Sequence, residues 1–349
     1  MRLPKRCSFF RGSRGLSLNL VLIALACFAI LATGTAEAQL PAPLQTQPGQ
    51  AQPPVLKVQT EVVNVYAVVK GKHGEVIPDL TKSDFEITDN GVPQEIQYFT
   101  RQTDVPLTMG IMVDTSPSQQ NLLPIEQRQA KAFLAEVMRP KDLAFVLRFD
   151  VSVELLQDFT PNVQSLDQAI DSTVINGGQA IVPGTFPSGQ VGYTHLYDAI
   201  WLASSPQLMA DQAGRKVLIL LTDGQDEGSK ETLKDAIRSA QKADVMVYSI
   251  NIVDPRMYGT YNQYGGGYIG DSVLKMLSEQ TGGEYIRVGR WHDTSAAFQE
   301  IARQLRTQYL LGYSPTDRTR NGSYHKIRVR VLNKNYRVQA RQGYYAPAQ

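Results

Sequence analysis

The middle of the chain alternates between two hydrophobic patterns. Continuous apolar runs at residues 107–113, 145–147, 217–221 and 245–252 have the length of strands. Runs without alternation are typical of a parallel sheet that helices cover on both faces. Between these runs, apolar residues recur at the i, i+3, i+4 and i+7 spacing of one helix face. These stripes are Ala130, Phe133, Leu134 and Val137; Leu233, Ala236, Ile237 and Ala240; and Phe298, Ile301, Ala302 and Leu305. The alternation predicts an α/β fold with a doubly wound, mainly parallel sheet.

The two flanks of this region follow a different, two-residue period. Residues 55–104 and 307–349 alternate apolar and polar positions and contain the turn dipeptides Asn90-Gly91 and Asn321-Gly322, which is typical of antiparallel strands and hairpins. A few strands with one apolar face need a cover. We therefore expect the two flanks to combine into one immunoglobulin-like β-sandwich into which the α/β domain is inserted. Two separate β appendages are the alternative.

Oxygen-bearing side chains follow the apolar runs. Asp114, Ser116 and Ser118 come directly after the run 107–113, Asp223 follows the run 217–221, and Thr194 precedes a predicted helix at 196–203. Ligands of doubly wound sheets collect at the carboxyl ends of the strands. Carboxylates and hydroxyls suit Mg²⁺, and also Mn²⁺ or Ca²⁺, with one coordination position left for an outside carboxylate. Each piece alone is also an ordinary turn or helix start.

The five positions Asp114-x-Ser116-x-Ser118, Thr194 and Asp223 resemble the metal-ion-dependent adhesion site (MIDAS) of von Willebrand factor type A domains, and all five match. The resemblance covers residues 105–306 and implies the fold of a von Willebrand factor type A domain. It also implies that the two serines and the threonine bind the metal directly, and that the two aspartates bind it directly or through water. The whole chain is similar to bacterial secreted proteins called VWFA-related.

The first 38 residues have the composition of a signal peptide. A basic start precedes an apolar core at residues 20–32, and Ala36-Glu37-Ala38 fits the small-x-small cleavage pattern. An uncleaved membrane anchor and a lipoprotein modified at Cys27 are the alternatives. Residues 39–54 are rich in Pro and Gln and carry no charge, which is typical of a flexible linker. We expect an exported protein, periplasmic or extracellular.

Charge and cysteine content narrow the function classes. The leader holds five of the 35 basic and one of the 33 acidic residues, so the mature chain is close to neutral. That balance gives no indication of nucleic-acid binding, which uses clustered basic surfaces. Both cysteines, Cys7 and Cys27, also lie in the leader. We therefore expect a mature chain without disulfides, and without a second apolar stretch long enough to span a membrane.

The predicted function is metal-dependent binding of a protein or cell-surface partner that presents a carboxylate. The loop at 175–193 contains five glycines, and the loop at 255–270 is rich in Tyr and Gly. This mixture is typical of binding surfaces, although a surface insertion without a partner has the same composition. A metal-dependent hydrolase is an alternative, with His195 as its base. However, the sequence has neither a Gly-x-Ser-x-Gly nucleophile motif nor a phosphate-binding Gly-x-x-x-x-Gly-Lys loop, so we do not expect an enzyme. A structural envelope module with a dispensable metal site is the third class.

Overall fold

The computed structural model describes residues 62–102, 105–176, 194–252, 269–289 and 294–348. The predicted signal peptide and linker lie outside the described residues, as do most of the predicted loops at 175–193 and 255–270.

The α/β region is built on a six-stranded sheet in the order β10-β9-β8-β5-β6-β7. Its strands are β5 (Leu107–Asp114), β6 (Leu143–Phe149), β7 (Val153–Thr160), β8 (Arg215–Leu221), β9 (Val245–Ile252) and β10 (Tyr285–Val288). All neighbours are parallel except β7, which runs antiparallel to β6 at one edge. The predicted mainly parallel α/β sheet is therefore confirmed.

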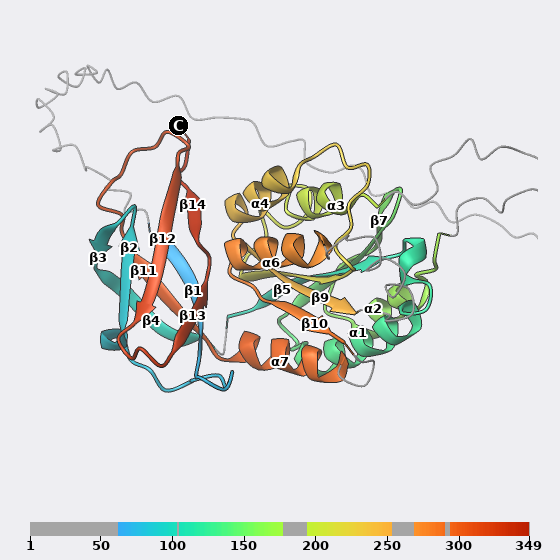
Figure 1. Ribbon diagram of the computed structural model, residues 1–349, viewed down its shortest axis with the longest axis horizontal. Coiled ribbons are helices and arrows are strands. Elements are labelled where there is room, and N and C mark those ends of the chain that lie inside the picture. Colours follow the sequence, from blue (N-terminus) through green and yellow to red (C-terminus); the bar gives the residue numbers. More distant parts are fainter. Residues whose placement is uncertain (1–61, 103–104, 177–193, 253–268, 290–293, 349) are drawn as a thin grey trace, which may run out of the picture. The chain divides into compact units, whose positions relative to one another are not determined.

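Helices cover both faces of this sheet (Figure 1). Helices α1 (Leu123–Val137), α2 (Val163–Asp171) and α7 (Thr294–Arg306) pack on one face. Helices α3 (Leu196–Ala203), α4 (Leu233–Lys242) and α6 (Ile269–Thr281) pack on the other. Local capping defines where helices begin. Asn162 accepts hydrogen bonds from the amides of Gln164 and Ser165 at the start of α2, and Thr232 and Asp235 form a capping box at the start of α4.

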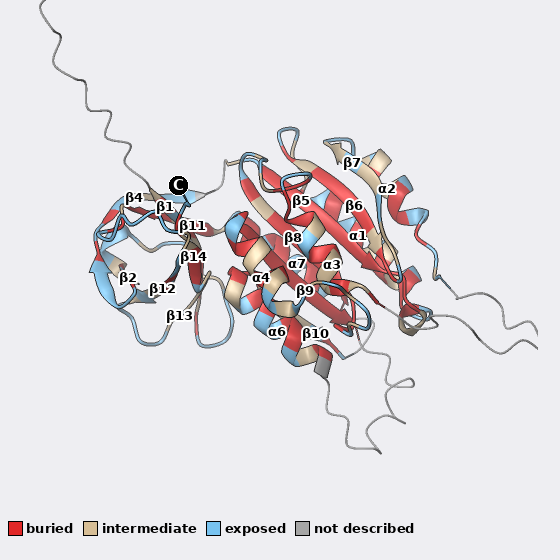
Figure 2. Ribbon diagram, turned by 90° about the horizontal axis from the view of Figure 1, so that it is seen from above, coloured by how far each residue is buried: buried red, intermediate tan, exposed pale blue. Residues whose placement is uncertain are grey.

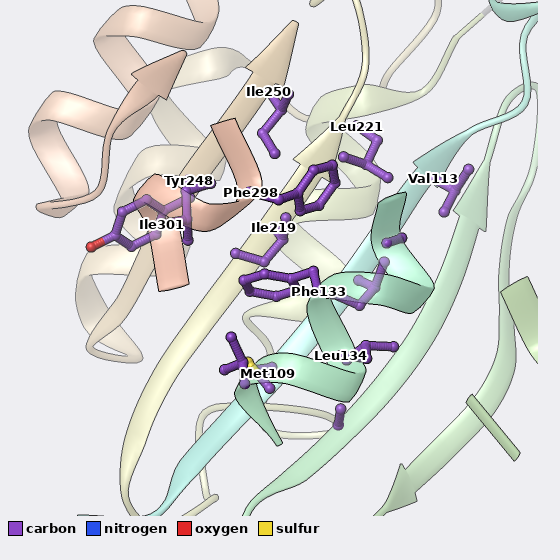
Figure 3. Close-up of a cluster of buried hydrophobic side chains, with 14 of the residues drawn as sticks. Met109, Val113, Phe133, Leu134, Ile219, Leu221, Tyr248, Ile250, Phe298 and Ile301 are labelled. Carbon is purple, nitrogen blue, oxygen red and sulfur yellow. The ribbon is translucent and has the colours of Figure 1, made fainter. Parts of the chain in front are cut away.

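The central strands are buried along their length because helices lie above and below them (Figure 2). Every residue of β5 and of β9 is buried. On the α1 and α7 face, the rings of Phe133 and Phe298 lie 5.5 Å apart between the helices and the sheet (Figure 3). The rigid core holds the carboxyl ends of β5 and β8 in fixed positions.

The flanking segments form two four-stranded sheets, in the orders β13-β1-β11-β4 and β14-β12-β2-β3. The strands are β1 (Val63–Lys70), β2 (Phe85–Asp89), β3 (Val92–Gln94), β4 (Ile96–Gln102), β11 (Gln308–Tyr313), β12 (Tyr324–Val331), β13 (Arg337–Ala340) and β14 (Gly343–Tyr345), with a short 3₁₀ helix η1 (Lys82–Asp84) before β2. Both sheets mix strands from before and after the α/β region, since β1 pairs with β11 and β12 pairs with β2. One hydrophobic core joins the two sheets. The immunoglobulin-like character of this β region stays a prediction.

Within the part of the chain that the structure describes, no helix combines the length and the apolar character needed to cross a membrane.

Candidate metal-binding site

Two of the predicted ligands lie on neighbouring strands. Asp114 is the last residue of β5, and Asp223 follows β8 by two residues. The register pairs Val113 with Leu221 across the two parallel strands, so Asp114 lies opposite Thr222. The Thr222 hydroxyl donates a 2.6 Å hydrogen bond to Asp114 Oδ2. This bond holds the Asp114 side chain at the edge where Asp223 begins the next loop.

The loop after β5 turns back toward Asp114. The Ser116 amide donates to Asp114 Oδ1 at 2.9 Å, and Ser116 begins the 3₁₀ helix η2 (Pro117–Gln119). The Ser116 and Ser118 hydroxyl oxygens are 3.1 Å apart. The Asp-x-Ser-x-Ser spacing thus brings both hydroxyls to one side of the turn, beside the carboxylate.

Thr194 reaches the same edge from a third segment. It is buried, and its carbonyl accepts a 2.9 Å hydrogen bond from the amide of Glu227 in the loop after β8. The next amide, that of His195, donates to the carbonyl of Asp150 at 2.8 Å. The Asp150 carboxylate in turn accepts a 2.6 Å bond from the Thr115 hydroxyl. Asp150 therefore connects the segment of Thr194 with the Asp-x-Ser-x-Ser loop through hydrogen bonds to both.

A glycine shapes the turn after Asp223. Gly224 has φ +80°, and a Cβ there would lie 2.7 Å from the carbonyl oxygen of Gly270 in α6, so both the backbone conformation and the space favour glycine. The turn lets the Gln225 amide donate to Asp223 Oδ1 at 3.1 Å. Asp223 is 4% exposed and Asp114 is fully buried.

The electrostatics of the site disfavour its anionic form when no cation is bound. Burial, followed by the charge of Asp223, raises the pKa of Asp114 to about 7, while hydrogen bonds from Ser116 and Thr222 oppose the shift. Desolvation and a like charge both penalise the carboxylate. A cation beside the two aspartates would remove most of this penalty, since it supplies the opposite charge.

The donor set fits a hard dication. The five predicted residues, Asp114, Ser116, Ser118, Thr194 and Asp223, all lie at this edge of the sheet and offer only oxygen atoms, which Mg²⁺, Mn²⁺ and Ca²⁺ accept. In the described segments, no three His, Cys, Asp or Glu side chains gather in a way that could bind a metal by themselves. Any site here therefore depends on the hydroxyls as well as the carboxylates. The individual ligand roles stay predictions.

Several residues around the site were not singled out from the sequence. Thr222 orients Asp114, and the buried Gln119 donates to the Ser118 hydroxyl at 3.3 Å. The signal for Thr222 was its position opposite Asp114 in a parallel pair of strands. Asp226, in the loop after β8, accepts hydrogen bonds from the Tyr197 amide at 3.0 Å and the Ser229 hydroxyl at 2.6 Å. It therefore anchors the start of α3. His195 is the residue that precedes this helix.

No protein-family model and no curated protein matches this sequence. Among solved structures, the chain is similar to proximal thread matrix protein 1 from the mussel byssus, at 13% identity and a TM-score of 0.46, over 62% of this chain and 51% of that one. This chain thus spans about half the length of the mussel protein. Another structure of the mussel protein has a zinc-occupied MIDAS motif.

Two bacterial structures are also similar. The vWF domain of the type V pili tip protein Mfa5 from Porphyromonas gingivalis has 13% identity and a TM-score of 0.41, over 58% of this chain and 95% of that one. The von Willebrand factor type A protein from Catenulispora acidiphila has 12% identity and a TM-score of 0.43, over 76% and 74%. Both bacterial structures are named for the von Willebrand factor domain, the family that the five-residue motif of this chain resembles.

Proposed function

We propose that this protein is an exported binding module that holds a divalent cation, Mg²⁺ or else Mn²⁺ or Ca²⁺, and uses it to bind a carboxylate on a protein or cell-surface partner. One observation supports the proposal most: the buried carboxylates of Asp114 and Asp223, at the ends of neighbouring strands, share one edge of the sheet with the segments of Ser116, Ser118 and Thr194. Asp114, Ser116, Ser118, Thr194 and Asp223 would hold the cation.

The charge balance of this donor set favours an anionic partner. The hydroxyls of Ser116, Ser118 and Thr194 are neutral ligands, and only Asp114 and Asp223 bring negative charge. A dication among them keeps its attraction for a further anionic oxygen, because few of its ligands are charged. A cation that keeps water in part of its shell has a position that a partner can take. These properties describe a binding site that an acidic side chain of another molecule can complete.

Binding of the cation and of the partner can be tested together. Isothermal titration calorimetry of the chelator-treated protein with MgCl₂ or MnCl₂ should detect uptake, and Asp114→Ala should abolish it because the central carboxylate is lost. Asp211→Ala is the matched control, since Asp211 is exposed and precedes β8 at the opposite end of the strand from Asp223. Immobilised protein should then retain an envelope partner with Mg²⁺ and release it with EDTA. Equal retention with and without the chelator would contradict the proposal.

The two alternative functions give different results in the same assays. A structural envelope module would keep its partners in the Asp114→Ala variant. A metal-dependent hydrolase would show cation-dependent cleavage that disappears in His195→Ala. We favour binding because the sequence has neither the Gly-x-Ser-x-Gly nor the Gly-x-x-x-x-Gly-Lys motif.

A further inference from the structure

Helix α1 carries a carboxylic acid on its buried face. That face consists of Leu123, Glu126, Ala130, Phe133, Leu134 and Val137. Glu126 is fully buried, and its amide donates to the carbonyl of Leu122 at 3.0 Å in the first helical turn. Acidic residues are almost never fully buried unless they are paired. The position of Glu126 therefore requires an explanation.

Glu126 lacks the partners that a buried carboxylate needs. Within the described residues, neither of its carboxylate oxygens has a hydrogen-bond partner, and the side-chain oxygen of the buried Gln119 lacks one as well. All three atoms are acceptors. An unsatisfied buried polar atom costs about 1–3 kcal/mol, and more when it is charged. Such a group is explained when a missing water or ion supplies the donors.

These unsatisfied acceptors belong to the segment that directly follows the Asp-x-Ser-x-Ser loop, and the Gln119 side-chain amide donates to the Ser118 hydroxyl at 3.3 Å. The Gln119 amide donates to the Ser116 carbonyl at 3.0 Å, and the Leu122 amide donates to the Gln119 carbonyl at 2.9 Å. The Leu122 carbonyl then accepts from Glu126. A continuous series of backbone hydrogen bonds thus leads from the Asp-x-Ser-x-Ser loop to Glu126. Burial, followed by the charges of Asp114 and Asp223, raises the pKa of Glu126, so its carboxylate lies within electrostatic reach of both.

A hydrated cation would satisfy these acceptors. Water bound to a metal ion directs its oxygen at the metal and its hydrogens outward, which makes it a hydrogen-bond donor to surrounding carboxylates and amides. Mg²⁺ and Mn²⁺ commonly keep several waters. Among the described residues, Glu126 does not complete a group of three carboxylates that could hold a metal by themselves. We therefore consider Glu126 as a partner of cation-bound water and not as a direct ligand.

We propose that Glu126 is a positioning residue of the cation site, and that its carboxylate accepts hydrogen bonds from water bound to the cation, with the Gln119 side-chain oxygen as a second acceptor. This inference rests on the proposed function, because it requires a cation among the five predicted ligands. Partners around the direct ligands orient bound water and adjust the affinity for the metal. A bound cation would favour the ionised form of Glu126, whose charge would then add to those of Asp114 and Asp223 and favour a dication over a monovalent ion.

The test compares Glu126→Gln with Glu136→Gln, because Glu136 is an exposed residue of the same helix. Titration calorimetry with MnCl₂ measures the dissociation constant of each chelator-treated protein. Loss of a residue that supports metal ligands typically weakens metal affinity about 10–100-fold, and we expect a change in this range for Glu126→Gln and none for Glu136→Gln. Thermal unfolding in EDTA is the second readout. A melting temperature equal to or above that of the wild type would show that the weaker binding does not come from a damaged fold.

Two outcomes would overturn the inference in distinguishable ways. If the wild type and Glu126→Gln bind Mn²⁺ equally, Glu126 has no role at the cation, while the proposed function stands. If the wild type takes up neither Mg²⁺ nor Mn²⁺, the proposed function fails and the inference fails with it. A crystal structure of the Mn²⁺-loaded wild type tests the same point without any substitution. It supports the inference if a cation-bound water lies within hydrogen-bond distance of a Glu126 carboxylate oxygen, and overturns it if that carboxylate bonds only to protein groups.

Discussion

The α/β region and the β region each bury a group of polar side chains. Among the described residues, only the group in the β region pairs all its members with one another through hydrogen bonds. In the β region, Asp89 Oδ1 lies 3.0 Å from His325 Nδ1. Asp89 Oδ2 accepts hydrogen bonds from the Tyr313 and Tyr344 hydroxyls at 3.0 and 3.1 Å. Tyr313 belongs to one sheet and the other three residues to the second. The Asp89 group therefore fastens the two sheets together with its own donors and acceptors.

The polar group at the candidate metal site consists of Asp114, Gln119, Asp223 and Glu126, and its members do not all find partners within the described residues. Asp114 and Asp223 place like charges close together, and Gln119 and Glu126 leave acceptor atoms unsatisfied within the described residues. A buried polar network that satisfies all its members specifies a fold, whereas a partly satisfied one is destabilising. The Asp89 group therefore stabilises the fold. The second group keeps acceptor atoms that a cation and its bound water would satisfy under the proposed function.

The largest expected effect is the loss of the Asp89 group. Asp89→Ala removes the acceptor of the buried Tyr313 and Tyr344 hydroxyls and the charged partner of His325, and we expect the free energy of unfolding to fall by about 3–5 kcal/mol. Urea unfolding measures this change, which should be the same with Mg²⁺ and with EDTA. A loss below about 1 kcal/mol would mean that the Asp89 group does not stabilise the fold through its hydrogen bonds.

A smaller effect of a different kind is expected at Asp114. A cation that binds only the folded state at 100 times its dissociation constant stabilises the wild type by about 2.7 kcal/mol. The Asp114→Asn variant should gain nothing from the cation, and in EDTA it should be at least as stable as the wild type because a repulsive buried charge is gone. Urea unfolding with saturating MgCl₂ and with EDTA gives both values. Equal Mg²⁺ stabilisation of the two proteins would contradict this expectation.

The smallest effect concerns pH in the absence of metal. The pKa of Glu126 is raised above its ordinary value of 4.5, so the folded state binds this proton more tightly than the unfolded state does. Its contribution to stability is fully present below pH 4.5 and is lost as pH rises through the folded pKa. Glutamine does not titrate. In EDTA, the melting temperature of Glu126→Gln relative to the wild type should therefore rise as the pH increases above 4.5. A difference that stays constant with pH would show that the Glu126 carboxyl does not change its protonation state across this range.

Hydrophobic periodicity was sufficient to predict most of the strands and helices that form the core of the α/β region. The apolar runs at 107–113, 217–221 and 245–252 all lie in parallel strands, and the three predicted helix stripes lie in α1, α4 and α7. Strand β7 was not predicted, because an edge strand in which no residue is fully buried lacks the apolar run of the inner strands. The five candidate ligands were predicted because their spacing resembles a known motif, and their role as metal ligands stays a prediction.

Glu126 illustrates what spacing alone did not reveal. Extending the stripe of Ala130, Phe133, Leu134 and Val137 back by one turn reaches Glu126, so a carboxylate at a core position was visible as an exception to the pattern. Its lack of partners was not visible, because that depends on which groups pack around it in three dimensions. Thr222 and Asp150 likewise act through contacts between strands and loops that only the folded chain brings together.

The most direct measurement is an anomalous difference map from crystals of the wild-type protein grown or soaked with MnCl₂. We expect one strong peak enclosed by the side-chain oxygens of Asp114, Ser116, Ser118, Thr194 and Asp223, some of them bound through water. A map with no peak at this edge of the sheet, in crystals where the same manganese concentration labels other sites, would contradict a cation-dependent function for this protein.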